Sequence, residues 1–91
     1  MVDIDLPGDI KYDVMKATFE WIQLDPEKNH YMNKEQTQDV YYRVCDFGHL
    51  GPVTPNAIDE EFDLIAGESG KINRLQFLKL VKNIYDKYLQ R

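Results

Sequence analysis

The chain carries one six-residue pattern twice, as YMNKEQ at residues 31–36 and as KINRLQ at residues 71–76. In each stretch an Asn follows an apolar residue and precedes a Gln by three places. An Asn side chain in this position accepts a hydrogen bond from the third backbone N–H of a helix, while the Gln side chain reaches back to the Asn backbone. Each stretch therefore predicts a helix that begins directly after its Asn, at Asn33 and at Asn73.

An amphipathic run follows each of these predicted starts. Apolar and small side chains recur at intervals of three and four, which is typical of a helix with one buried face. In the first run they are Thr37, Val40, Tyr41 and Val44, and in the second run they are Phe77, Leu80, Val81, Ile84 and Tyr88. We expect the first run to end near Gly48.

Two more helices are expected, one before each of these runs. The first follows Pro7-Gly8-Asp9 and extends to about residue 24, with Met15, Phe19 and Ile22 at helical spacing and Pro26 beyond its end. The other begins at Thr54, a capping residue followed by proline at the first helical position, and carries Ile58, Phe62 and Ile65. The chain thus reads as one domain over residues 1–91, with a first unit at about 10–47, a linker at 48–54 and a second unit at about 55–90.

Composition narrows the classes of partner. The 91 residues hold 16 acidic and 11 basic side chains, for a net charge of −5, which argues against nucleic acid or an anionic membrane and favours a basic partner. The lone Cys45 cannot form an intramolecular disulfide and fits a reducing compartment. No apolar run is long enough to span a membrane. We expect a cytoplasmic protein.

The paired units resemble the EF-hand superfamily over about residues 10 to 89. With Gln36 and Gln76 as the twelfth loop positions, Met32 and Ile72 become the eighth, where that family joins its two loops by a short antiparallel bridge. The resemblance implies an all-α fold, in which two helix-loop-helix units pack as one four-helix lobe.

The metal ligands of that family are mostly missing. A calcium loop supplies side-chain oxygens at positions 1, 3, 5 and 12, and has Gly at position 6. The first loop offers Asp25, Glu27, Asn29 and Gln36, with His30 in the Gly position. Because Gln36 is neutral and offers one oxygen, we expect no cofactor beyond weak Ca²⁺ or Mg²⁺ binding.

The lengths of the two loops differ from the family pattern in separate ways. The second loop is one residue short and places Ile65, Gly67, Ser69 and Gln76 at the ligand positions, so no metal is expected there. The first loop has two interpretations. A buried face of Ala17, Trp21 and Leu24 gives the ordinary twelve-residue loop, whereas a face of Met15, Phe19 and Ile22 gives a loop two residues longer.

The chain lacks most of the metal ligands of the family but keeps the apolar faces of its helices. This combination indicates a calcium-insensitive protein-binding module, which would bind an amphipathic, basic helix of a partner. Acidic side chains at residues 59–63 would then face the partner's Lys or Arg residues. The resemblance is greatest to single-lobe myosin light chains, so an IQ-type neck segment of an unconventional myosin heavy chain is one candidate partner. We expect the groove to be lined by Phe19, Val40, Val44, Phe62, Leu80, Val81, Ile84 and Tyr88.

Two other functions stay open at this point. The chain could be a small dimeric EF-hand protein that packs through its first and last helices and binds a divalent cation weakly, or a regulatory EF-hand domain of a larger protein. The first function predicts a monomer in the absence of partner, and the dimeric alternative a homodimer. We do not expect an enzyme. Cys45 and His49 are one helical turn apart, but Gly48 ends the helix between them and no neighbour in sequence orients His49.

Overall fold

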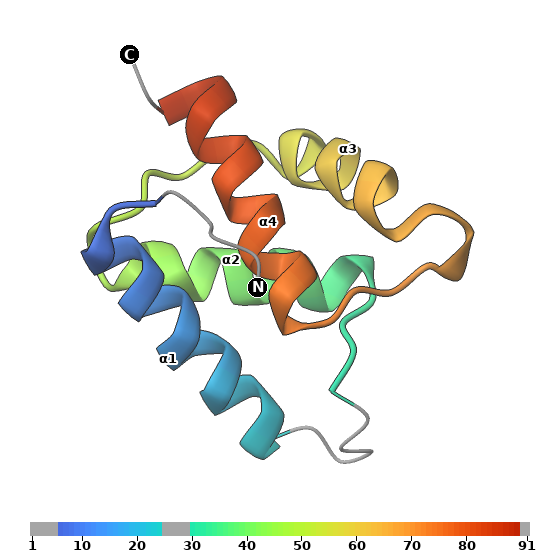
Figure 1. Ribbon diagram of the computed structural model, residues 1–91, viewed down its shortest axis with the longest axis horizontal. Helices are drawn as coiled ribbons and strands as arrows, with labels where there is room; N and C mark the ends of the chain where they lie inside the picture. Colours follow the sequence, from blue (N-terminus) through green and yellow to red (C-terminus); the bar gives the residue numbers. More distant parts are fainter. Residues whose placement is uncertain (1–5, 25–29, 90–91) are drawn as a thin grey trace.

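The structure is a computed structural model that describes residues 6–24 and 30–89. Within these residues it is all-helical, as predicted, with α1 at Gly8–Leu24, α2 at Lys34–Asp46, α3 at Pro55–Ala66 and α4 at Arg74–Ile84 (Figure 1). A 3₁₀ turn, η1 (Gly67–Ser69), follows α3, and a π-helical turn, η2 (Tyr85–Leu89), continues α4. None of the described helices is long and apolar enough to cross a membrane.

Local hydrogen bonds fix where three of the helices begin. The Asn33 side chain accepts from the Gln36 N–H at 2.8 Å, and the Gln36 side chain accepts from the Asn33 N–H at 2.9 Å. Asn73 and Gln76 make the same two bonds, both at 2.8 Å. Thr54 caps α3 by accepting from the Ala57 N–H. These bonds confirm the three predicted helix starts. The starts were predictable from the sequence because each capping signal acts within four residues of the chain.

The helices pack around one shared core. In Figure 1, α4 stands in the middle, with α1 on one side of it and α3 on the other, and α2 crosses behind. Contacts between helices join α1 to α2, α2 to α3, α3 to α4 and α1 to α4. Every helix therefore covers apolar side chains of two others.

The predicted buried faces of α2 and α4 are confirmed. The buried residues of these helices are Thr37, Val40, Tyr41 and Val44 in α2, and Phe77, Leu80, Val81 and Ile84 in α4. Tyr88 departs from the pattern, because its side chain is 48% exposed. It lies in η2, where the wider π turn rotates it away from the face that Ile84 continues.

The apolar stripe expected on α1 is wrong in part. Met15 and Phe19 are 52% and 56% exposed, whereas Ile10, Val14 and Ala17 are buried. The buried side of α1 also holds Asp13 and Thr18, whose polar groups find hydrogen-bond partners. Of the two faces that the sequence left open, the structure buries Ala17 and partly buries Trp21, whereas Met15, Phe19 and Leu24 are exposed.

The two loops have the same backbone geometry at matching positions. Met32 and Ile72 form an isolated antiparallel bridge, in which each N–H donates to the other's carbonyl at 2.8 and 2.9 Å. Two residues earlier, His30 and Gly70 both have positive φ, at 64° and 70°. Residues 30–36 and 70–76 are thus a structural repeat with a period of 40 residues, and both bridging side chains are fully buried.

Candidate functional site

Most of the residues predicted to line a partner groove lie inside the closed core. Six of the eight are between 0% and 4% exposed, namely Val40, Val44, Phe62, Leu80, Val81 and Ile84. Phe19 and Tyr88 are exposed, on α1 and η2. A partner can touch all eight together only if the helices separate.

The predicted cation ligands are described only in part. Asp25, Glu27 and Asn29 lie outside the described residues. The Gln36 side-chain oxygen accepts a hydrogen bond from the Asn33 backbone, which directs it toward the helix start. Among the residues that the structure places, no three His, Cys, Asp or Glu side chains form a group that could hold a metal ion.

His49 is oriented by a residue that is distant in sequence. Its Nδ1 lies 2.7 Å from a carboxylate oxygen of Asp13, which is 4% exposed, and its Nε2 lies 3.9 Å from a carboxylate oxygen of Asp9. The Asp13 hydrogen bond raises the pKa of His49 above its ordinary value of 6.5, and the two carboxylate charges act in the same direction. This contact ties the segment after α2 to α1.

The His49 contact predicts a pH-dependent stability. Because the folded pKa is raised, protonated His49 contributes its full stabilisation below pH 6.5, and the contribution is lost as the pH rises through the folded pKa. Thermal melts between pH 5.5 and 9 should show the melting temperature falling by a few degrees on the alkaline side. In His49→Gln this fall should disappear, and an unchanged fall would contradict the assignment.

The Cys45 thiol is held in its neutral form. Burial raises the pKa of its thiol to about 11, and the nearby Asp46 charge adds to the shift. Its Sγ lies 3.7 Å from the Gly51 carbonyl, in hydrogen-bonding geometry. Because a neutral thiol is a poor nucleophile, Cys45 acts as a small apolar side chain at the edge of the core.

The acidic cluster on α3 is less available than the sequence indicates. Glu61 is 2% exposed, and its carboxylate accepts from Lys87 at 2.7 Å. Asp63 pairs with Lys34 at 3.0 Å, and Asp59 accepts from the Gln38 side chain. Of this cluster only Glu60 has no hydrogen-bond or ion-pair partner among the described residues.

A stripe of carboxylates that sequence reasoning missed lies along the outer face of α2. Glu35, Asp39 and Asp46 are exposed and follow each other at four and seven places, so they project from one side of the helix, opposite Tyr41 and Val44. None of the three has an ion-pair partner in the described part of the chain. Their helical spacing is visible in the sequence, at residues 35, 39 and 46.

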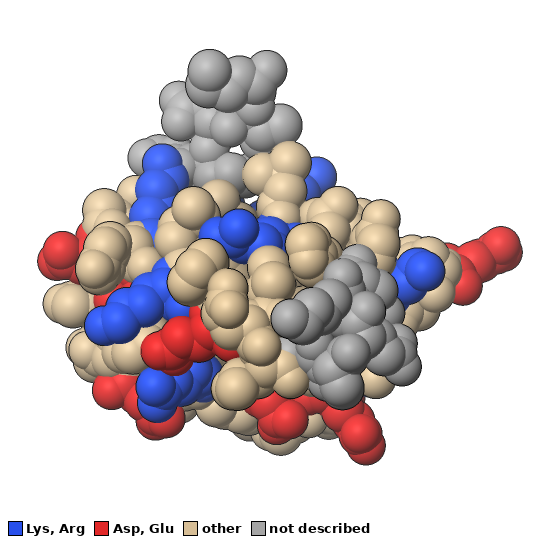
Figure 2. Space-filling model, turned by 90° about the horizontal axis from the view of Figure 1, so that it is seen from below, with Lys and Arg blue, Asp and Glu red and all other residues tan. Residues whose placement is uncertain are grey.

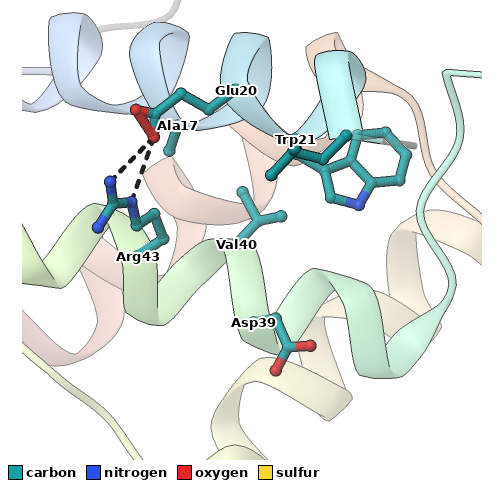
Figure 3. A pocket seen from close by; sticks show the side chains of 7 residues that line it. Ala17, Glu20, Trp21, Asp39, Val40 and Arg43 are labelled. Carbon is teal, nitrogen blue, oxygen red and sulfur yellow. Dashed lines mark hydrogen bonds and ion pairs between the residues drawn. The ribbon is translucent and has the colours of Figure 1, made fainter. Parts of the chain in front are cut away.

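An apolar pocket of about 180 Å³ opens between α1 and α2 beside this acidic stripe. Ala17 and Val40 are its buried residues, and Trp21 and Leu24 line it farther along α1. Figure 3 shows Val40 projecting from α2 toward α1, with Trp21 farther along. The remaining lining residues are Glu20, Asp39 and Arg43.

The charged lining residues leave the pocket with an unpaired carboxylate. Arg43 pairs with Glu20 at 3.1 Å at one end of the pocket, while Asp39 points away from α1 (Figure 3). Asp39 therefore belongs both to the pocket and to the acidic stripe. A ligand that suits this site has an apolar side chain next to a positive charge.

Charge is unevenly distributed over the molecule. α3 carries four acidic and no basic residues, whereas α4 carries three basic and no acidic residues. Figure 2 shows one face, on which acidic side chains lie along the lower edge and at both sides, and basic side chains lie mostly above them, with one basic group among the acidic ones at the lower left.

The fold and these surfaces define a small all-helical domain with a closed apolar core and pockets between its helices. Comparison of the chain with protein-family models, with curated proteins and with solved structures finds no match.

Proposed function

We propose that this chain is a calcium-insensitive, EF-hand-like protein-binding domain that binds an amphipathic, basic helix of a partner protein. The observation that carries the proposal is the pocket between α1 and α2 with the acidic stripe beside it. An apolar pocket with unpaired carboxylates along α2, one of the two helices that form it, suits a partner helix with one apolar stripe and one basic stripe.

The 40-residue repeat supports the EF-hand-like part of the proposal. Both units place a left-handed residue, a bridging residue and a capping box in the same order, at His30 and Gly70, Met32 and Ile72, and Asn33 and Asn73. A left-handed sixth position and a bridged eighth position match the EF-hand pattern that the sequence resembles. Two such units packed as one lobe give the proposed architecture.

Two observations support calcium insensitivity. The twelfth-position side chains, Gln36 and Gln76, each use their single oxygen to accept a hydrogen bond from the backbone N–H of a helix cap. In the second loop, the Ser69 hydroxyl lies within hydrogen-bonding distance of the Ala66 and Lys71 carbonyls, so that two loop carbonyls are satisfied by the chain itself.

Because the core is closed, we expect the partner helix to bind first at the surface of the domain and not inside the core. Separating α1 from α2 to reach Val44 or Leu80 would expose many apolar side chains, each worth about 1.5 to 3 kcal/mol of burial. The pocket is already open and reaches Val40, one of the predicted groove residues. An apolar side chain of the partner would lie against Trp21 and Leu24, and its Lys or Arg residues would pair with Asp39. An IQ-type myosin neck helix has this chemistry, which is why the light-chain resemblance suggests it as one partner.

A peptide titration tests this proposal. The probe is a 20-residue helical peptide with Leu at positions 4, 8 and 11 and Lys or Arg elsewhere on the same side, and Trp21, the single tryptophan of the chain, reports binding. Leu24→Ser should weaken binding about 10-fold, since a buried Leu contributes about 1.5 kcal/mol. Asp39→Asn should weaken it by a smaller factor, and 2 mM Ca²⁺ or EDTA should change nothing.

Leu64→Ser is the matched control, because Leu64 is 74% exposed on α3 and Leu24 is 81% exposed on α1. Equal losses from Leu24→Ser and Leu64→Ser would place binding elsewhere. Calcium-dependent binding would contradict the metal-independent mechanism. A dimer in sedimentation that the peptide does not dissociate would favour the alternative of a small dimeric EF-hand protein.

A further inference from the structure

A second groove lies between α1 and α4, separate from the pocket described above. It has a volume of about 210 Å³ and is lined by Val14, Met15 and Thr18 of α1 and by Arg74, Leu75 and Leu78 of α4. Met15 and Leu75 are 52% and 53% exposed, so apolar surface reaches the solvent on both walls. Phe19, 56% exposed and four residues after Met15, extends the wall of α1 by one helical turn.

Arg74 is held at this groove without a carboxylate. Its Nε donates to the Thr18 hydroxyl at 3.2 Å, and a terminal nitrogen lies 3.9 Å from the Met15 sulfur. The Thr18 hydroxyl in turn donates to the Val14 carbonyl at 2.8 Å, which fixes its direction. The guanidinium is thus oriented by the groove, and its terminal nitrogens are not in an ion pair with any described residue.

Among the Lys and Arg residues that the structure describes, those without an acidic or aromatic partner all lie on these two helices. Six of the nine described Lys and Arg side chains contact a carboxylate or a ring, for example Lys34 with Asp63 and Lys16 with Phe47. The three that do not are Lys11, Arg74 and Lys79. Lys11 is one turn from Met15, and Lys79 is one turn from Leu75. This part of a chain with a net charge of −5 is therefore apolar and positive.

We propose that the groove between α1 and α4 is a second docking site, which binds an acidic amphipathic helix of a partner protein. An apolar side chain of that helix enters between Met15 and Leu75, and a carboxylate one turn away pairs with Arg74 in the bidentate geometry that guanidinium groups favour. Charge complementarity selects the occupant, because the first site is flanked by unpaired carboxylates and this groove by unpaired cations. The domain would then join two helices of opposite charge.

The observations favour an acidic helix over two other occupants. An anionic membrane surface is bound by clusters of about four to eight Lys and Arg residues, and this groove has three unpaired ones on an acidic chain. A second copy that docked the same faces together would bring Arg74 near its own symmetry mate and repel it. A concave site with one oriented guanidinium suits one helix with placed carboxylates.

The test uses the full chain and two labelled 18-residue helical peptides that share Leu at positions 4, 8 and 11. One peptide has Glu and the other has Lys on the flanking positions. Fluorescence anisotropy is measured at 100 mM salt, where screening over about 10 Å removes most of the long-range repulsion from the chain. The variants are Arg74→Glu, Leu75→Ser and the controls Lys34→Gln and Leu64→Ser.

Arg74→Glu should lower the affinity for the acidic peptide at least 10-fold, and Leu75→Ser should lower it about 5-fold. Both controls should leave this affinity within 2-fold of the unchanged chain. Arg74 is the first residue of α4, where a negative charge suits the helix dipole, so Arg74→Glu is expected to fold. The basic peptide should respond to Leu24→Ser and not to Leu75→Ser. Failure of the second docking site is therefore distinguishable from failure of the proposed function.

Four results would overturn the second docking site. The first is that Arg74→Glu binds the acidic peptide as tightly as the unchanged chain does, and the second is that Leu64→Ser and Leu75→Ser weaken that binding equally. The third is a dimer in sedimentation that Arg74→Glu dissociates. The fourth is co-sedimentation of the chain with 30% phosphatidylserine vesicles that depends on Arg74. The third result would assign the groove to a second copy of this chain. The fourth would assign it to a membrane surface.

Discussion

Replacing Leu80 by Ala should lower the free energy of unfolding by about 3 kcal/mol, because a buried Leu loses both its transfer free energy and its packing when it becomes Ala. Leu80 is 0% exposed in the middle of α4, the helix that contacts both α1 and α3. For a chain of this size the loss corresponds to a fall in melting temperature on the order of 15 °C. Urea unfolding followed by circular dichroism measures the free energy of unfolding, and a thermal melt followed by the same signal measures the melting temperature.

Leu75→Ala is the matched control for this prediction. Leu75 belongs to the same helix and is 53% exposed, so its truncation should lower the stability by less than about 1 kcal/mol. A Leu80→Ala protein with a normal melting temperature and weakened binding of the basic peptide would mean that Leu80 lines an open groove. That outcome would restore the groove predicted from the sequence and would contradict the closed core.

The parts of the fold that sequence reasoning predicted are those set by nearby residues. The starts of α2 and α4 depend on hydrogen bonds between residues three apart, at Asn33 with Gln36 and at Asn73 with Gln76. Their buried faces follow from apolar spacing over three turns. The bridge between Met32 and Ile72 is different, because it joins residues 40 apart, and only the EF-hand resemblance paired them.

The choice between the two faces of α1 that the sequence left open could not be made in this way, because contacts distant in sequence decide it. Asp13 lies inward because His49, 36 residues later, pairs with it, and Thr18 lies inward because it bonds to the α1 backbone and receives Arg74 from α4. Neither partner is visible in the periodicity of the helix. Met15 and Phe19 are then on the outside, where they form the groove with α4.

Glu61 is a residue whose position the sequence did signal. It follows Ile58 by three places and precedes Ile65 by four, so it lies within the apolar stripe of α3 and not beside it. A carboxylate in such a position is buried only with a partner, and here Lys87 supplies the charge from η2. What the sequence could not supply was the partner, which lies 26 residues later in a turn that is not α-helical.

The surfaces that carry the proposals follow from the same long-range packing. The pocket between α1 and α2 exists because Ala17, a small side chain, faces Val40, so that Trp21 and Leu24 stand beside a gap and do not fill it. Arg74 reaches the second groove only because α1 crosses the start of α4. Each helix was predictable from its own residues, but each binding surface is made by two helices at once.

Asn33→Ala and Asn73→Ala should each lower the free energy of unfolding by about 1 kcal/mol, the contribution of one Asn cap. The double variant should lose less than the sum of these two losses, because the Met32–Ile72 bridge joins the two helix starts, so that fraying of one start has already loosened the other. Urea unfolding of both single variants and the double variant measures this coupling. Asn56→Ala is the control, because Asn56 lies exposed in the first turn of α3 and is not its cap. Strictly additive losses would mean that each loop stabilises its own helix independently. The two units of the 40-residue repeat would then share a conformation without stabilising each other.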